Sequence, residues 1–324
     1  MNFFERMQAL DRRYIYLVVA LAIIIPLLIP FNSRTYTTTH VENVYKMIDS
    51  FAGKKDKAIL MCFDHNASTM AELYPMEVAI LRHCFERNIK VFTLCFMPSA
   101  SPLVDYAINN TKEEFPNIQS GVDYCNFGYK PAGLFLPIVL GMGDDIAEAV
   151  DTDSEGRKVS NLEIMEDIRN YDDMNLVVDF AASSAVLSWV YYARVRFGAN
   201  IAAGITAVMA ADNYPYLQTG QLVGMLSGLK GAAEYEKLVD TFASYEDNNF
   251  PNGRPFSKEV EKETWVKITE KVLPFADKEL PYKFKTARIG MNAQSVAHIM
   301  IIVFIVLGNI GYFVIRKKQN QDLG

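Results

Sequence analysis

Six polar side chains stand at or near the ends of apolar runs in this sequence. They are Asp64, His65, Asn126, Lys130, Asp179 and Asp212. If those runs form parallel strands, their carboxyl ends meet at one edge of a sheet, which is where open α/β folds bind ligands. The sequence therefore predicts a binding site for a polar ligand at that edge. A divalent cation between Asp64 and Asp179 is one such ligand.

Two other interpretations of these residues stay open. Asp and Asn at a strand end commonly cap the helix that follows, and Asp64 with Ser68 has the pattern of a turn. Alternatively, Asp64, His65 and Asp179 would serve a metal-assisted hydrolase. Catalytic motifs give the hydrolase little support, because the chain has no GxSxG, P-loop or HExxH sequence and no GxGxxG after the first apolar run. We assign no catalytic residue, and the sequence identifies no cofactor.

Five apolar runs are predicted to be the strands that position these side chains. They are residues 57–63, 89–97, 121–128, 175–180 and 200–210. Segments with helical periodicity separate the runs, and another such segment (40–51) precedes the first one. Strands that alternate with helices form βαβ units and a parallel sheet covered on both faces. We therefore predict a doubly wound, mostly parallel five-stranded α/β domain, Rossmann-like or flavodoxin-like in outline.

A glycine pattern follows the last predicted strand. Gly220, Gly224, Gly228 and Gly231 fall on one stripe if the segment from Tyr216 to Phe242 is a single helix. A stripe of small residues allows another backbone to approach closely, as small-xxx-small motifs do in membranes. The approaching backbone belongs either to a neighbouring helix of the same domain or to another subunit, and we assign the four glycines to a candidate interface.

Two long apolar segments predict membrane anchoring. Tyr14–Phe31 and Val296–Ile315 contain no formal charge and have the length that crosses a bilayer. Basic residues before the first segment (Arg6, Arg12 and Arg13) favour a cytoplasmic N-terminus. We therefore expect a two-pass protein of the cytoplasmic (inner) membrane, N-in and C-in, with an extracytoplasmic main domain. The expected order is a tail (1–13), a span (14–31), an amphipathic linker (32–53), the α/β domain (54–245), a helical extension with a tether (246–295), a second span (296–315) and a tail (316–324).

Charge and cysteine content exclude some partners. The net charge of −6 opposes binding to a nucleic-acid backbone. The four cysteines, Cys62, Cys84, Cys95 and Cys125, form no CxxC motif, and three of them lie in apolar strand-like runs. They also have no His partner at metal-ligand spacing. We interpret them as small core residues, with a disulfide left open for an oxidising compartment, and we expect no zinc site.

Three segments resemble a prokaryotic family of membrane proteins. They are CFDHNASTMAELYPMEVAILRHCFERNIKVF, VDYCNFGYKPAG and TGQLVGMLSGLKGAAEYEKL, and the similarity covers most of residues 40–240. Members of that family have two spans around an extracytoplasmic α/β domain and no established activity, so the resemblance transfers no catalytic residue. It implies membrane anchoring and a larger assembly.

These features together predict a membrane-anchored extracytoplasmic α/β subunit. Its expected function is that of a scaffold or binding module in a homo- or hetero-oligomeric membrane complex. The alternative is the membrane-tethered, metal-assisted hydrolase with a site at the carboxyl ends of the strands.

Overall fold

A computed structural model of the chain describes residues 11–29, 31, 36–249 and 285–322. The chain divides into two compact units. One comprises Met1–Ser33 and Ile289–Gly324, and the other comprises Arg34–Arg288. Residues 250–284, which form most of the predicted helical extension and tether (246–295), lie outside the described residues, as do residues 1–10 of the N-terminal tail.

The larger unit is built on a six-stranded parallel sheet with the strand order β3-β2-β1-β4-β5-β6. Its strands are β1 (Ala58–Asp64), β2 (Lys90–Cys95), β3 (Tyr124–Tyr129), β4 (Leu176–Ala181), β5 (Asn200–Ile205) and β6 (Gly224–Ser227). The five predicted strands are confirmed, and β6 is an addition. The order 3-2-1-4-5-6 is that of the Rossmann-type doubly wound sheet, and it reverses between β1 and β4.

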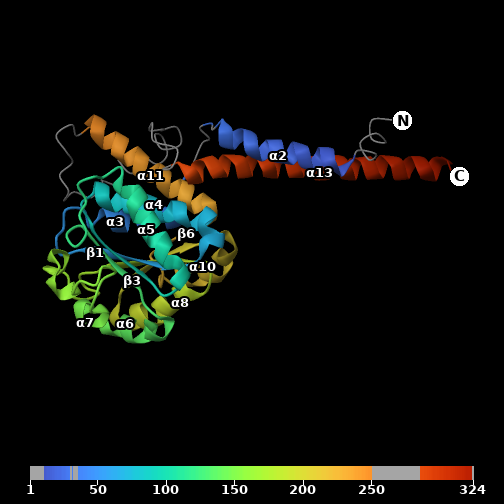
Figure 1. The fold of residues 1–324 in the computed structure, drawn as a ribbon. Coiled ribbons are helices and arrows are strands. Elements are labelled where there is room, and N and C mark those ends of the chain that lie inside the picture. The colour runs from blue at the N-terminus through green and yellow to red at the C-terminus, as the bar shows by residue number, and fades with distance from the viewer. Residues whose placement is uncertain (1–10, 30, 32–35, 250–284, 323–324) are drawn as a thin grey trace. The chain divides into compact units, whose positions relative to one another are not determined.

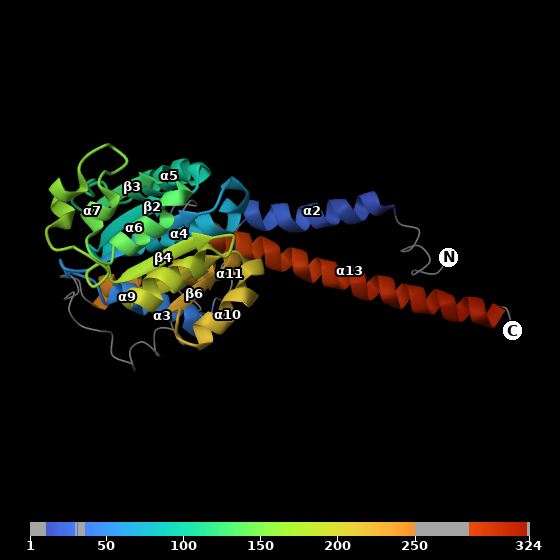
Figure 2. The ribbon, with the colours of Figure 1, turned by 90° about the horizontal axis from the view of Figure 1, so that it is seen from below.

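Helices cover both faces of this sheet (Figure 1). One layer contains α3 (Thr39–Asp49), α4 (Met70–Glu86), α5 (Ser101–Lys112) and α11 (Gly228–Asn249). The other contains α6 (Phe135–Gly141), α7 (Ile146–Val150), α8 (Ala185–Trp189), the π-helical turn η6 (Val190–Arg194) and α9 (Val195–Phe197), and Figure 2 shows this side. The sequences of the strands are continuous apolar runs because both faces of the sheet are buried. In β1, for example, every residue is buried.

The remaining elements of the larger unit connect these layers. α10 (Ala210–Gln218) lies between β5 and β6 in the sequence. Single 3₁₀ turns precede or link the helices at η1 (Ala67–Thr69), η2 (Pro98–Ala100), η3 (Ala132–Leu134), η4 (Val159–Asn161), η5 (Glu163–Met165) and η7 (Ala207–Met209). The segment expected as an amphipathic linker forms α3, whose apolar side chains are buried within this unit.

The prediction of one glycine-striped helix from Tyr216 to Phe242 is wrong. α10, β6 and α11 divide this segment, so the stripe does not exist on any helix. Gly220 and Gly228 have positive φ angles of 71° and 58° at the end of α10 and the start of α11, conformations that glycine adopts without steric cost. The subunit interface inferred from the stripe therefore loses its premise.

The other two glycines allow close packing inside the larger unit. A Cβ on Gly224 in β6 would lie 2.3 Å from the carbonyl oxygen of His40 in α3. A Cβ on Gly231 would lie 2.9 Å from backbone atoms of Leu226. Intramolecular packing, which the sequence left open as the alternative to an interface, accounts for both positions.

The smaller unit contains the apolar helices. In the described part of the chain, one helix is long and apolar enough to cross a membrane, from Thr286 to Val314 within α13 (Thr286–Asp322). The other helix, α2 (Arg12–Leu28), has 17 residues, which is about 25 Å of helix. That length falls short of the roughly 30 Å of a bilayer core, so the predicted first span is not found as a complete helix.

Candidate functional site

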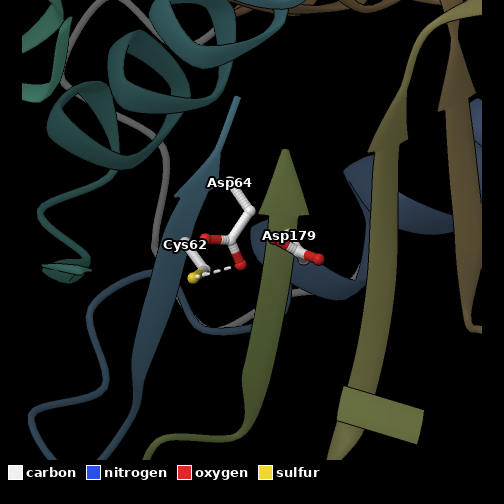
Figure 3. A group of neighbouring side chains, drawn as sticks. All are labelled: Cys62, Asp64 and Asp179. Atoms are coloured by element: carbon white, nitrogen blue, oxygen red, sulfur yellow. Dashed lines mark hydrogen bonds between the residues drawn. The ribbon is translucent and has the colours of Figure 1, made fainter. Parts of the chain in front are cut away.

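Three side chains meet where the strand order reverses. Cys62 and Asp64 belong to β1 and Asp179 to β4, and one ligand atom from each lies within 4.8 Å of the others. Cys62 is the register partner of Asp179 in the parallel pair of β1 and β4. Since side chains alternate between the faces of a strand, all three lie on the same face of the sheet (Figure 3). We call them the switch-point cluster.

Asp179 is the unusual member of the switch-point cluster. Its side chain is fully buried, and within the described residues neither carboxylate oxygen makes a hydrogen bond of ordinary geometry; the polar groups beside it are the Asp64 carboxyl and the Cys62 thiol. Its register partners on either side are Cys62 and Ala203, both small. Within the described residues, no lysine or arginine forms an ion pair with Asp179 or Asp64. Burying a carboxylate without an oppositely charged partner lowers the stability of the fold unless the group takes up a proton or binds a cation.

Asp64 accepts hydrogen bonds from its own strand β1 and from the residue that follows β2. The Cys62 thiol donates to Asp64 Oδ2 at 3.4 Å, and the backbone N–H of Phe96, just beyond β2 (Lys90–Cys95), reaches Oδ1 at 3.4 Å. Burial raises the pKa of all three groups in the cluster, and for Cys62 and Asp179 the negative charge of Asp64 raises the pKa further. The cluster therefore resists holding three negative charges by itself.

An aromatic layer covers this face of the sheet. The ring of Phe96 lies 6.5 Å from that of Trp189 at the end of α8. Trp189 is fully buried, and its indole N–H has no partner among the described residues. The π-helical turn η6 follows Trp189 directly, and such turns are frequent at functional sites. The position of Trp189 also makes it a spectroscopic reporter of this region.

His65 does not belong to the switch-point cluster. It follows Asp64 in the sequence, but its buried imidazole makes a 2.5 Å hydrogen bond to Glu77 of α4, in the helical layer on the opposite face. Burial is the largest single influence on the pKa of His65 and lowers it, but the hydrogen bond to Glu77, the charge of Glu77 and smaller contributions from Asn66 and Asp64 together leave the pKa raised. The expectation that His65 acts together with Asp64 and Asp179 is therefore not met by the geometry.

Asn126 and Lys130 lie on the outermost strand of the sheet and just after it. The amide oxygen of Asn126 accepts hydrogen bonds from Thr93 at 3.0 Å and from the backbone of Gly128 at 2.9 Å. The Lys130 ammonium donates to the carbonyl of Thr152 at 2.8 Å. β2 lies between β3 and β1, so these residues stabilise the edge of the sheet and do not join the switch-point cluster.

Asp212 is exposed in the first turn of α10 and is not part of the cluster. Helix capping explains a different residue at the end of β1. The side chain of Asn66 accepts from the backbone N–H of Ser68 at 2.9 Å and caps η1. The capping interpretation therefore applies to Asn66, whereas Asp64 bonds to Cys62 and Phe96.

Sequence reasoning missed Cys62 as a member of the site. The signal was present, since Cys62 stands two residues before Asp64 and therefore on the same face of any strand that contains both. We had interpreted all four cysteines as core residues. Cys84, Cys95 and Cys125 are indeed buried, and none of the four forms a disulfide.

Comparisons with known proteins found no relative of this chain. No protein-family model matches it, and neither the curated proteins nor the solved structures contain a match. The fold and the switch-point cluster are therefore the basis for any functional conclusion.

Proposed function

We propose that this chain is a membrane-anchored α/β binding module whose switch-point cluster binds a divalent cation. The observation that carries this proposal is the fully buried Asp179 carboxylate, which lies beside Asp64 and pairs with no basic side chain in the described part of the chain. Carboxylates are hard oxygen ligands for divalent cations. Open α/β sheets bind ligands at the point where the strand order reverses, and the cluster occupies that point.

Membrane anchoring at both ends is part of the proposal. Large apolar side chains of α2 are exposed over the described part of the chain, among them Leu17, Leu21, Ile25 and Leu28. α13 likewise exposes Ile299, Ile302, Ile305 and Phe313. Helices with such side chains exposed are suited to lipid. With Ile29 and Phe31 added, the apolar segment of α2 approaches the length of a span. We therefore propose two spans, and the N-in and C-in orientation, with the larger unit outside the cytoplasm, rests on the basic residues before the first one, Arg6, Arg12 and Arg13.

A cation titration tests the binding function. The full chain, purified in detergent and treated with a chelator, is titrated with Mg²⁺, Ca²⁺, Mn²⁺ and Zn²⁺ by calorimetry and by thermal unfolding. A cation at 100 times its Kd should stabilise the protein by about 2.7 kcal/mol. Asp179→Asn should abolish this effect. The matched control is Asp212→Asn, which changes an exposed carboxylate that is also a predicted site residue. It should leave the stabilisation by the cation unchanged. Absence of any specific cation effect contradicts the proposal.

The topology has its own test. All four native cysteines are buried, so a single introduced cysteine reports its side of the membrane. In intact cells of a bacterial expression host, a membrane-impermeant maleimide should label Lys158→Cys, whose side chain is 59% exposed. Asn2→Cys and Gly324→Cys should be labelled only after permeabilisation. Labelling of either terminus in intact cells excludes the N-in and C-in arrangement.

A subunit role in a larger membrane complex is our second proposal, and a different observation supports it. Apolar side chains are exposed around η6 at Leu134, Leu136, Tyr191, Tyr192 and Val195. Ring contacts join Tyr191 to Tyr216 of α10 and Tyr192 to Phe135 of α6, so the exposed groups belong to adjoining elements. Exposed apolar patches commonly mark protein contacts.

The mass of the particle extracted from the native membrane in mild detergent tests this second proposal. A multi-subunit particle that Tyr192→Glu reduces to a single chain supports a contact at η6. A monomer, or a complex that Tyr192→Glu leaves intact, excludes that contact.

A further inference from the structure

We infer that the ion bound at the switch point is a thiophilic divalent metal of the zinc type, with Cys62, Asp64 and Asp179 as its protein ligands. This inference rests on the proposed cation-binding function and specifies its ligand. It starts from the same observation, the fully buried Asp179 side chain, whose oxygens make no hydrogen bond of ordinary geometry within the described residues, and adds the sulfur of Cys62 in the same cluster.

The donor atoms and their spacing fit such an ion. Zinc binds thiolate sulfur at about 2.3 Å and carboxylate oxygen at about 2.0–2.2 Å, so tetrahedral ligands lie roughly 3.5 Å apart. The Cys62 sulfur lies 3.4 Å from Asp64 Oδ2, and all three donors lie within 4.8 Å of one another. The register pairing of Cys62 with Asp179 and the two-residue spacing of Cys62 and Asp64 fix this arrangement on two adjacent strands.

The chemistry of the donors distinguishes among cations. Mg²⁺ and Ca²⁺ require a shell of oxygen ligands, six or more for Ca²⁺, and a thiol does not serve them. Soft thiolate donors select zinc and other transition metals instead. The cluster supplies one sulfur and two carboxylates, with no lysine or arginine paired to either carboxylate in the described part of the chain. A divalent metal would offset two of the three negative charges of the deprotonated donors.

The number of protein ligands has a further consequence. Three protein ligands leave a fourth position for water or a small molecule, which is the pattern of open zinc sites. Asp64 is 7% exposed whereas Cys62 and Asp179 are fully buried, so the accessible side of the cluster is the carboxyl edge of the sheet. A small ligand would therefore reach the ion from that edge.

Cobalt(II) substitution gives the direct test, because a thiolate–cobalt bond produces a charge-transfer absorption band in the near ultraviolet. The chelator-treated full chain in detergent is titrated with Co²⁺ and then with Zn²⁺. We expect one ion per chain, the charge-transfer band, and displacement of Co²⁺ by Zn²⁺. Cys62→Ser should remove the band and weaken Zn²⁺ binding at least 100-fold.

Cys84→Ser is the matched control, because Cys84 is an equally buried cysteine on α4, outside the cluster. It should retain the band and the affinity. Circular dichroism and thermal unfolding establish that each variant is folded. Should Cys62→Ser not fold, Cys62→Ala and Asp179→Asn provide the same comparison, with a matching loss of Zn²⁺ affinity expected from each.

The outcomes separate this inference from the function on which it rests. If Mg²⁺ or Ca²⁺ binds in a manner that requires Asp179 but not Cys62, the cation-binding function stands and the zinc-type site is wrong. If Co²⁺ binds without the charge-transfer band, Cys62 is not a ligand. If no cation binds to the folded wild-type chain, both proposals fail, and a proton held at Asp179 is the remaining account of the cluster.

Discussion

Asp179 and Asp240 are both buried carboxylates, and their surroundings differ in a way that separates a structural acid from a candidate ligand. Asp240 in α11 is 2% exposed and accepts hydrogen bonds from both terminal nitrogens of Arg82, each at 3.2 Å. It also pairs with Arg288. Asp179 is fully buried, and its oxygens make no hydrogen bond of ordinary geometry within the described residues. Two arginine side chains therefore pair with Asp240, whereas none of the described arginines or lysines pairs with Asp179.

The region around Asp240 is a continuous network of paired charges. Arg82 also binds Glu114 at 2.7 and 3.2 Å. The carboxylate of Glu236 accepts from the backbone N–H groups of Ala287 and Arg288 at 3.0 and 3.1 Å, at the start of α13. These charges hold helices together, and each depends on the others. At the switch point, by contrast, no basic side chain of the described residues pairs with the carboxylates, so opposite responses to mutation are expected from the two regions.

Arg82→Met should produce the largest effect. The change removes the cation shared by Glu114 and Asp240 and leaves Asp240 deeply buried with fewer partners, which should lower the free energy of unfolding by about 3–5 kcal/mol. Denaturant unfolding of the full chain in detergent measures it, with the fluorescence of buried Trp189 as the signal in a Trp265→Phe background. A loss below about 1 kcal/mol would remove the distinction between the two regions.

Glu236→Gln should change how stability depends on pH. Burial raises the pKa of Glu236 from its ordinary value near 4.5 to about 7. The folded protein therefore holds a proton that the unfolded chain releases, so this contribution to stability is fully present below pH 4.5 and is lost as pH rises through about 7. The difference in unfolding free energy between pH 5 and pH 8 should shrink by about 2–3 kcal/mol in the variant.

Chelator-treated full chain, unfolded at several pH values with the same fluorescence signal, provides this measurement. Lys158→Met, a change at an exposed charge, serves as the control. An unchanged pH profile in Glu236→Gln would mean that the backbone N–H groups of α13 offset the burial of the carboxylate.

The sequence predicted the sheet well because its signal is local. Continuous apolar runs separated by helical segments identified β1 to β5 and the parallel arrangement, and two members of the switch-point cluster, Asp64 and Asp179, followed from their positions near strand ends. The short strand β6 was missed because the spacing of the glycines in and around GMLS fits one face of a helix. Only the neighbouring β5 and α3 make it a strand, and contacts so distant in sequence leave no periodicity.

The same limit explains the errors in the site. The residues that meet at the edge of the sheet depend on the order of its strands, and a single sequence does not give the strand order. Asn126 and Lys130 were therefore grouped with Asp64 although β2 separates β3 from β1. His65 was included because it follows Asp64, yet the alternation of side chains along a strand places it toward Glu77. The register pairing that brings Cys62 to Asp179 likewise appears only in the folded sheet.

Asp179→Asn should have the opposite sign to Arg82→Met. In the metal-free protein at neutral pH, the change removes an ionisable group that has no partner, so we expect a gain of about 1 kcal/mol in unfolding stability. The same variant should lose the stabilisation by Zn²⁺. Wild type and variant are compared with and without Zn²⁺, again by Trp189 fluorescence. A loss of stability in the metal-free variant would show that Asp179 already has a structural partner.

Lys158→Met should have the smallest effect, although its ion pair is among the shortest. The Lys158 ammonium lies 2.5 Å from Asp151, but the two side chains are 59% and 62% exposed. Water screens exposed charges and solvates them when the pair is lost, so a change below about 0.5 kcal/mol is expected. The Arg82–Asp240 contacts are longer, at 3.2 Å, yet should contribute several times more because they are buried. Equal losses from Lys158→Met and Arg82→Met in the same unfolding assay would mean that burial does not govern the strength of these pairs, and the contrast drawn between Asp179 and Asp240 would then lose its physical basis.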